Sequence, residues 1–316
     1  MTDYFSETDV CALKEIVEYP ADSIGHADFI FSHGDYILLS EPKLNYLISS
    51  YNMATKSLTR FLSKGTGPNE LPDVQQIDVY EKDTLFFVKS TFSKDIFIYA
   101  FNNTALLSLE QVPGDNVSLF FDGNSVICSQ YGKKRFSLHD IQNKSTVEFG
   151  DSIVIENCRP DLIPYVLQGL CAGNAELKRF VWASIYGDIF EIYDYKNPNR
   201  IETINSTKGI LPVIKSDQNQ PVFSSDSKFG VVSITVTNKY IYMLYNENKI
   251  KDFQDKKDDV LLCNKILVYD WNGTPQKILK TNKLLKSISY NEKHKKIFCI
   301  GHDDDGNGKI FYIDDL

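Results

Sequence analysis

The segment Ile266-Leu267-Val268-Tyr269-Asp270 decides the fold, because it is one of six copies of the same short pattern. In each copy, a run of three or four alternating apolar residues leads to an aromatic residue and Asp or Asn, and a polar turn follows. The other copies are Leu47–Asn52, Phe97–Asn102, Phe136–Asp140, Phe190–Asp194 and Ile310–Asp314. A pattern that recurs along the whole chain predicts a repeated supersecondary unit.

The flanks of each copy complete that unit. Two short β-type runs precede every copy, and a further run follows it in five of the six. The runs are rich in Val, Ile, Tyr and Phe and end at Gly, Asn, Asp, Pro or Lys, as strands do. Four antiparallel strands repeated in this way predict an all-β fold, a six-bladed β-propeller in one domain over residues 1–316. The predicted blades are 26–64, 73–112, 115–150, 165–206, 229–281 and 286–316.

The last blade lacks a fourth strand, and one β-type run near the start, Val10–Val17, has no blade. We expect this N-terminal run to pair as the outer strand of the last blade. Main-chain hydrogen bonds would then close the ring and leave no unpaired sheet edge.

Two stretches interrupt the pattern. Asn246–Leu262 is polar, with four lysines balanced by four aspartates, and predicts a solvated loop in the fifth blade. Because loops often carry binding, a lid that contacts a partner is the alternative. Arg159–Leu170 predicts one helical turn.

Charge and composition exclude several classes of protein. The 316 residues carry 34 basic and 42 acidic side chains, a net charge of −8 with scattered Lys and Arg, so we expect no nucleic-acid partner. No apolar run approaches the roughly 18 residues of a membrane span. The first seven residues are polar and acidic and do not resemble a secretory signal. A cytoplasmic protein and an exported protein whose signal or lipid anchor has been removed both fit.

The six cysteines form no C-x-x-C motif, and several lie in apolar runs, such as Cys128 and Cys299. We expect buried thiols rather than a disulfide framework.

One loop after the first blade has a specific sequence, Lys64-Gly65-Thr66-Gly67-Pro68-Asn69-Glu70-Leu71-Pro72. Its two glycines permit positive φ or a close approach of the backbone, and Pro68 stiffens the exit. A phosphate site is not expected, because a strand rather than a helix follows. We predict an inter-blade loop with a structural or binding role for Gly65, Gly67, Pro68 and Glu70.

This G-x-G-P-x-E-[FL] phrase resembles that of the TolB-like six-bladed propellers, an NHL-related family common in Bacteroidetes. The segment Asn174–Phe180, which leads into Ile189–Asp194, is similar to the middle of the same family. The resemblance implies a six-bladed propeller that is usually exported, to the periplasm or cell surface, and mostly without an assigned activity.

A metal site is the main chemical alternative to be weighed. Asp303, Asp305 and Asn307 have the spacing of a calcium loop, with Gly306 between them and Asp314 further on. The same residues are also preferred at a hairpin tip. We therefore predict no cofactor, with calcium at this loop as the weaker alternative.

No hydrolase motif is present, neither G-x-S-x-G nor H-E-x-x-H, and the five histidines form no metal-ligand pairs. The sequence thus favours a non-enzymatic module of the cell envelope that binds a protein, peptide or glycan at a propeller face or channel. The alternative is a calcium-dependent hydrolase or lactonase that uses the axial channel, since ligands from several blades leave no sequence motif.

Overall fold

The computed structural model describes residues 1–16, 27–81, 84–91, 93–111, 118–129, 134–216 and 221–314. The chain divides into two compact units. Unit 1 comprises Met1–Asp9 and Gly114–Lys280, and unit 2 comprises Val10–Pro113 and Thr281–Leu316. Some limits of the predicted blades and of the predicted N-terminal strand lie outside the described residues, namely His26, Val112, Val17 and positions 115 and 316.

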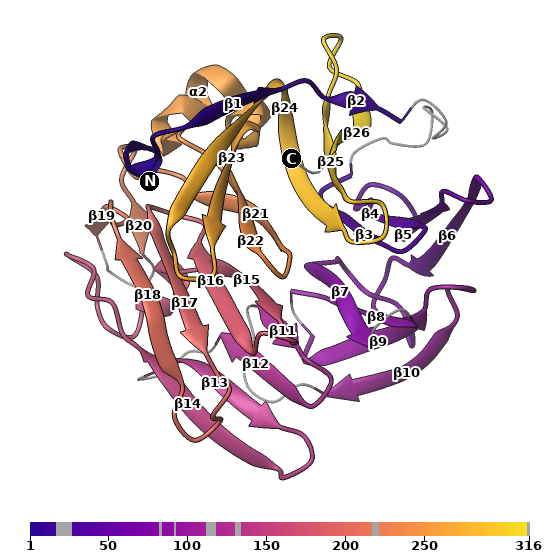
Figure 1. Cartoon of the computed structure of the whole chain (residues 1–316), viewed down its shortest axis with the longest axis horizontal. Helices are drawn as coiled ribbons and strands as arrows, with labels where there is room; N and C mark the ends of the chain where they lie inside the picture. The colour runs from indigo at the N-terminus through magenta and orange to yellow at the C-terminus, as the bar shows by residue number, and fades with distance from the viewer. Residues whose placement is uncertain are drawn as a thin grey trace. The chain divides into compact units, whose positions relative to one another are not determined.

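Unit 2 contains two four-stranded antiparallel sheets and a third group of four strands, which belongs to a larger sheet that continues through β24 (Figure 1). The first consists of β3 (Ile30–His33), β4 (Tyr36–Ser40), β5 (Tyr46–Asn52) and β6 (Ser57–Ser63). The second consists of β7 (Gln76–Glu81), β8 (Leu85–Lys89), β9 (Asp95–Ala100) and β10 (Leu106–Gln111). The third consists of the second half of β24 (Pro275–Asn291), then β25 (Lys296–His302), β26 (Gly308–Asp314) and β2 (Lys14–Glu15).

Unit 1 contains three further groups of four strands. The first consists of β11 (Leu119–Phe121), β12 (Ser125–Ser129), β13 (Lys134–Asp140) and β14 (Ser145–Asp151). The second consists of β15 (Gly169–Asn174), β16 (Arg179–Ser184), β17 (Ile189–Asp194) and β18 (Glu202–Lys208). The third consists of β21 (Val231–Val236), β22 (Tyr240–Tyr245), β23 (Cys263–Asp270) and the first half of β24. The predicted all-β architecture of four-stranded antiparallel blades is confirmed.

The repeated pattern corresponds to the third strand of the blades, and its last residue starts the next turn. Asp270 Oδ1 accepts hydrogen bonds from the backbone N–H groups of Asn272, at 2.8 Å, and Thr274, at 2.9 Å. Asn52 Oδ1 likewise accepts hydrogen bonds from the backbone N–H groups of Ala54 and Thr55. An Asx turn of this kind explains why the pattern ends in Asp or Asn.

The aromatic residues of the pattern pack in the core. In unit 1, Phe136 of β13 contacts Phe180, Trp182 and Tyr193 of the next blade, with ring centroids 5.4, 5.9 and 5.5 Å away. All four side chains are at most 2% exposed. These edge-to-face contacts join neighbouring blades through aromatic rings, as the composition predicts.

Three connections contain short elements, and in two of them the structure is more than the sequence predicts. Arg159–Leu170 contains the expected turn, α1 (Ile163–Val166). Asn246–Leu262 is not a simple loop, because it folds into η3 (Ile250–Asp252), α2 (Phe253–Lys256) and η4 (Lys257–Leu261). The connection before β21 contains a hairpin, β19 (Ile214–Ser216) and β20 (Val222–Phe223), which the sequence pattern does not predict. Each element is too short to show a periodicity.

The predicted N-terminal strand separates into two strands. β1 (Thr8–Cys11) pairs with β24, and only β2 pairs with β26, where Lys14 lies opposite Tyr312 and Glu15 opposite Phe311. The N–H of Ile16 continues this pairing, 2.9 Å from the carbonyl of Ile310. The last blade therefore receives its outer strand from the start of the chain, while closure of a full ring stays a prediction.

Deletion of residues 1–17 tests the role of this strand. We expect the melting temperature to fall by about 5 °C or more, because β26 would lose its edge partner. Val10→Ser is the matched control, since Val10 is 79% exposed, and we expect it to change the melting temperature by less than about 1 °C. A truncated chain with the same melting temperature as the intact chain would contradict the closure hypothesis.

Candidate functional site

The connections at one edge of unit 1 are joined by backbone hydrogen bonds. We call this edge, from which β15 and β21 begin, the leading edge. Its described residues are 152–168, 185–188, 209–216, 221–230 and 246–262. Gly187 N–H donates to Lys228, Asp188 N–H to Ile210 and Phe229 N–H to Asn248, at 2.9, 2.7 and 2.9 Å. Connections far apart in the sequence thus form one continuous surface.

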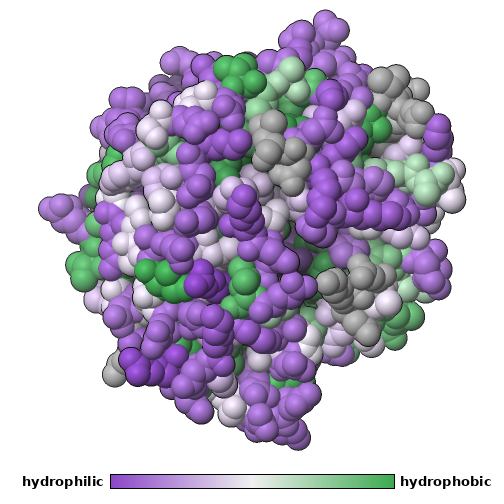
Figure 2. All heavy atoms as spheres, viewed as in Figure 1, coloured by the Kyte–Doolittle hydropathy of each residue, from purple (hydrophilic) through white to green (hydrophobic). Residues whose placement is uncertain are grey.

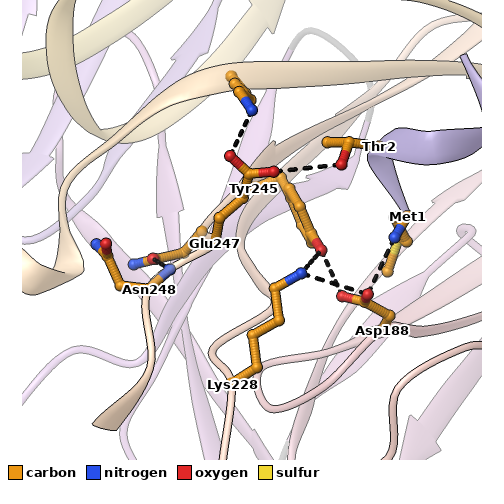
Figure 3. A network of polar contacts seen from close by, with 9 residues as sticks. Met1, Thr2, Asp188, Lys228, Tyr245, Glu247 and Asn248 are labelled. Carbon is orange, nitrogen blue, oxygen red and sulfur yellow. Dashed lines mark hydrogen bonds and ion pairs between the residues drawn. The ribbon is translucent and has the colours of Figure 1, made fainter. Parts of the chain in front are cut away.

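A buried carboxylate lies at the centre of this edge. Asp188 precedes β17 and is 2% exposed. Its Oδ1 accepts a hydrogen bond from the hydroxyl of Tyr245, at 2.5 Å, and its Oδ2 lies 3.0 Å from the α-amino nitrogen of Met1 (Figure 3). Lys228 Nζ is 3.4 Å from the same Oδ2 and also contacts the Tyr245 hydroxyl. Residues from two connections, the last residue of β22 and the first residue of the chain therefore meet at one carboxylate.

The turn that carries Asp188 is fixed by its backbone. Gly187 has φ +81°, and a side chain at this position would place its Cβ 2.5 Å from the carbonyl oxygen of Ile210. Ser184 Oγ donates to the carbonyl of Tyr186 at 2.7 Å, and Gly209 N–H donates to the carbonyl of Asp188 at 2.8 Å. Only glycine fits this close approach, so the turn has little freedom to move.

The electrostatics of the cluster favour the neutral form of the Tyr245 phenol. Burial raises the pKa of Tyr245, and the hydrogen bond and charge of Asp188 raise that pKa further. Tyr245 therefore keeps its proton and donates it to Asp188. The ammonium group of Lys228 lies 4.8 Å from the centre of the Tyr245 ring and adds a cation–π contact.

A second carboxylate, Glu247, lies beside the cluster (Figure 3). Its Oε1 accepts a hydrogen bond from Thr2 Oγ1 at 3.2 Å, and its Oε2 pairs with Lys265. Burial opposes ionisation of Glu247, but the hydrogen bond and charge of Lys265, with Thr2 and Lys228, outweigh it and lower the pKa. Glu247 is thus charged and accepts hydrogen bonds from Thr2 and Lys265.

The exposed apolar side chains of unit 1 gather on the same edge. Apart from Ile141, every exposed large apolar residue described in this unit lies in a leading-edge connection or in the N-terminal segment that contacts one. These residues are Tyr4, Val154, Tyr165, Ile210, Val213, Val222, Phe253 and Leu261. Figure 2 shows that apolar groups, in green, form small separate areas within a mainly hydrophilic face.

The glycine loop lies in unit 2, between β6 and β7, and is held by its own glutamate. Gly67 N–H donates to Glu70 Oε2 at 2.9 Å, and Gly65 N–H donates to the carbonyl of Leu71 at 2.9 Å. A side chain at Gly65 would overlap the Glu70 carboxylate, so the glycine allows close approach rather than positive φ. Asn69 has the positive φ of the loop, 63°. Pro68 is exposed beside it. A structural or binding role for this loop stays a prediction.

The predicted calcium loop is the tip of the β25–β26 hairpin. Asp303 Oδ1 accepts the backbone N–H groups of Asp305, at 3.0 Å, and Asn307, at 2.8 Å. These hydrogen bonds, that of Asn307 first, lower the pKa of Asp303. Within the described ranges, no three His, Cys, Asp or Glu side chains are grouped so that they can hold a metal ion. Asp303 thus closes the turn, and calcium at this loop stays a prediction.

All six cysteines lie in the described part of the chain and are thiols, and five of them are buried. Burial raises the pKa of Cys171 and of Cys263 to about 12, so these thiols are protonated at neutral pH. This matches the predicted role of small apolar residues.

Comparison with known proteins now supplies the family. A family model described as TolB-like 6-blade propeller-like matches residues 6–293, most of the chain. The chain belongs to this family. No curated protein matches it.

One solved structure agrees with the fold of this TolB-like propeller, and a second match is weaker. A member of the DUF4221 family from Bacteroides vulgatus covers 91% of the chain and 92% of its own length, with 10% identity and a TM-score of 0.57. The Cps50 (Swd1) β-propeller domain from Myceliophteria thermophila covers 92% and 96%, with 9% identity and a TM-score of 0.47. At these identities the similarity concerns the fold alone.

The residues at the centre of the TolB-like propeller's leading edge are not among those that the sequence pattern singles out. Asp188 follows Gly187 and therefore has the sequence of an ordinary turn, while Tyr245 has that of a strand residue. A charged residue directly before a strand of apolar residues is the only local signal.

No helix among the described residues is long and apolar enough to cross a membrane.

A melt with calcium and with EDTA tests the hairpin tip. We expect the two melting temperatures to agree within about 1 °C, because Asp303 is engaged in the turn. Bound calcium at 100 times its Kd would instead add about 2.7 kcal/mol and raise the melting temperature by several degrees. A calcium-dependent rise that Asp305→Asn removes would instead establish a metal site at this loop.

Proposed function

We propose that this TolB-like propeller is a non-enzymatic binding module whose leading edge in unit 1 takes a protein or peptide partner. The observation that carries the proposal is the position of the exposed apolar side chains. Ile210, Val222 and Phe253 come from two different connections of this edge, whereas among the described residues of unit 1 only Ile141 is an exposed large apolar residue on the opposite edge.

Single exposed apolar residues are common on protein surfaces, but their concentration on one edge marks an interaction surface. Loops supported by a rigid scaffold are where binding residues are found most often. Here the scaffold is the set of blades, and the Asp188 cluster fixes the connections to one another. The partner thus meets a preformed surface, which lowers the entropy lost on binding.

The polar groups of the edge support binding rather than catalysis. Asp188 contacts Tyr245 and Lys228. Glu247 contacts Thr2 and Lys265. Such pairs hold loops in position, and a reacting group would need an accessible acid, base or nucleophile in the same place. The proposal includes the cell envelope as the compartment, an expectation that follows from the resemblance of the glycine loop to that of exported propellers.

Selection from a phage-displayed peptide library tests this proposal on the full chain. We expect the triple variant Ile210→Ser, Val222→Ser, Phe253→Ser to lose at least about tenfold in affinity for the selected peptides, because each apolar contact contributes about 1 kcal/mol or more. Ile141→Ser, at a position with 48% exposure on the other edge, is the matched control. Peptides that bind the triple variant and the intact chain equally would contradict the assignment of the surface.

A further inference from the structure

A group of lysines lies on the leading edge beside some of its exposed apolar side chains. In the hairpin of β19 and β20, Ile214 is buried, whereas Val213 and Lys215 on either side of it are exposed. Val222, on the other strand of the hairpin, is also exposed. Because neighbouring residues of a strand point to opposite faces, the outward face of this hairpin presents two apolar side chains and one cation.

Two further lysines come to the same place from the 246–262 connection. The N–H of Lys251 donates to the carbonyl of Ser225 at 2.8 Å. The segment that holds this serine is also joined to the hairpin, because the N–H of Val213 donates to Ser227 Oγ at 3.1 Å. Lys251, and with it Lys249, is thus held beside the hairpin by contacts of the main chain.

One carboxylate faces the three ammonium groups. Asp226 Oδ1 lies 3.0 Å from Lys251 Nζ and 3.9 Å from Lys249 Nζ. The hydrogen bond and charge of Lys251 lower the pKa of Asp226, and the charges of Lys249 and then Lys215 lower it further. The neighbouring Asp252 is engaged with the backbone, where its Oδ2 accepts the N–H of Lys249 at 2.8 Å. Three cations around one anion leave a local excess of positive charge, in a chain whose net charge is −8.

We call Val213, Lys215, Val222, Lys249 and Lys251 the lysine patch. The side chains of Lys249 and Lys251 are 45% and 52% exposed, so a partner reaches their ammonium groups from solvent. Charge complementarity across an interface favours a partner with carboxylates beside apolar side chains. An anionic membrane is a poorer match, because its recognition takes a cluster of about four to eight Lys or Arg side chains.

We propose that the lysine patch binds an acidic segment of a partner protein, in which carboxylates alternate with apolar side chains. The carboxylates pair with the lysines, and the apolar side chains contact Val213 and Val222. The inference rests on the proposed binding function and specifies the chemistry of the partner. Because the chain as a whole is acidic, this local positive field also orients an acidic partner as it approaches.

The test uses two phage-displayed libraries of equal peptide length with the full chain as target. In one library, apolar positions alternate with Asp or Glu, and in the other they alternate with Lys or Arg. We expect the acidic library to yield binding peptides and the basic library to yield none, because only the acidic peptides complement the patch.

Substitutions in the patch are then measured with a labelled peptide from the acidic library, by fluorescence anisotropy. We expect Lys215→Gln with Lys251→Gln to weaken binding at least about fivefold, and the loss to shrink in about 0.5 M NaCl, where exposed charges are screened. Lys144→Gln with Lys196→Gln is the matched control. It removes the same charge from exposed turns of the opposite edge, where Lys196 Nζ lies 3.3 Å from Asp194 Oδ2, and we expect the affinity to stay within about twofold.

Three results would overturn the inference. They are a basic library that yields binders as readily as the acidic one, an acidic library that yields none, and acidic peptides that bind the two double variants equally. Binding to phosphatidylserine vesicles that the Lys215, Lys251 variant loses would overturn it as well, because the occupant would be a membrane surface. The proposed function would survive any of these results if peptides from the unbiased library still depend on Ile210, Val222 and Phe253.

Discussion

The leading edge of unit 1 depends on one constraint, the need of the buried Asp188 carboxylate for donors. A carboxylate that is 2% exposed is stable only when its charge and its lone pairs are matched. The phenol of Tyr245, the ammonium of Lys228 and the nitrogen of Met1 match them. Because these groups come from separate parts of the chain, satisfying Asp188 also fixes how the connections lie relative to one another.

The same principle operates on a smaller scale in the repeat. Asp or Asn at the end of the third strand accepts backbone N–H groups of the following turn, as Asp270 and Asn52 do. Aromatic residues of the third strands, such as Phe136, pack against rings of the next blade. In these repeats a polar residue thus defines the turn and an aromatic residue fills the core.

The sequence is sufficient to predict the blades because each strand carries its own local signal. The third strands, their turn residues and the outer strand Lys14–Glu15 all follow from residues within a few positions. The split between β1 and β2 does not follow, because both parts of Val10–Val17 are equally β-like. The hairpin of β19 and β20 and the turns of the 246–262 connection are set by contacts between connections, as where the N–H of Ile250 donates to the carbonyl of Ser227.

The candidate site is less predictable for a physical reason. Asp188, Lys228 and Tyr245 are up to 57 positions apart, and only the antiparallel order of the strands brings them to one edge. By contrast, the glycine loop and the Asp303 turn stand out in the sequence because their residues are adjacent. Within the described chain, both form mainly local hydrogen bonds. Clear local motifs thus mark turns here, and the site that joins connections has no motif.

Hydrogen exchange of Asp188→Asn tests the central claim most directly. The substitution keeps the shape of the side chain but leaves Lys228 without its counter-charge. We predict that the amides of Gly187, Gly209 and Phe229, which join the connections, exchange at least about tenfold faster, while those of the β13–β14 hairpin do not change. Unchanged exchange at all of these amides would show that the connections hold their places without the carboxylate, and would contradict the account.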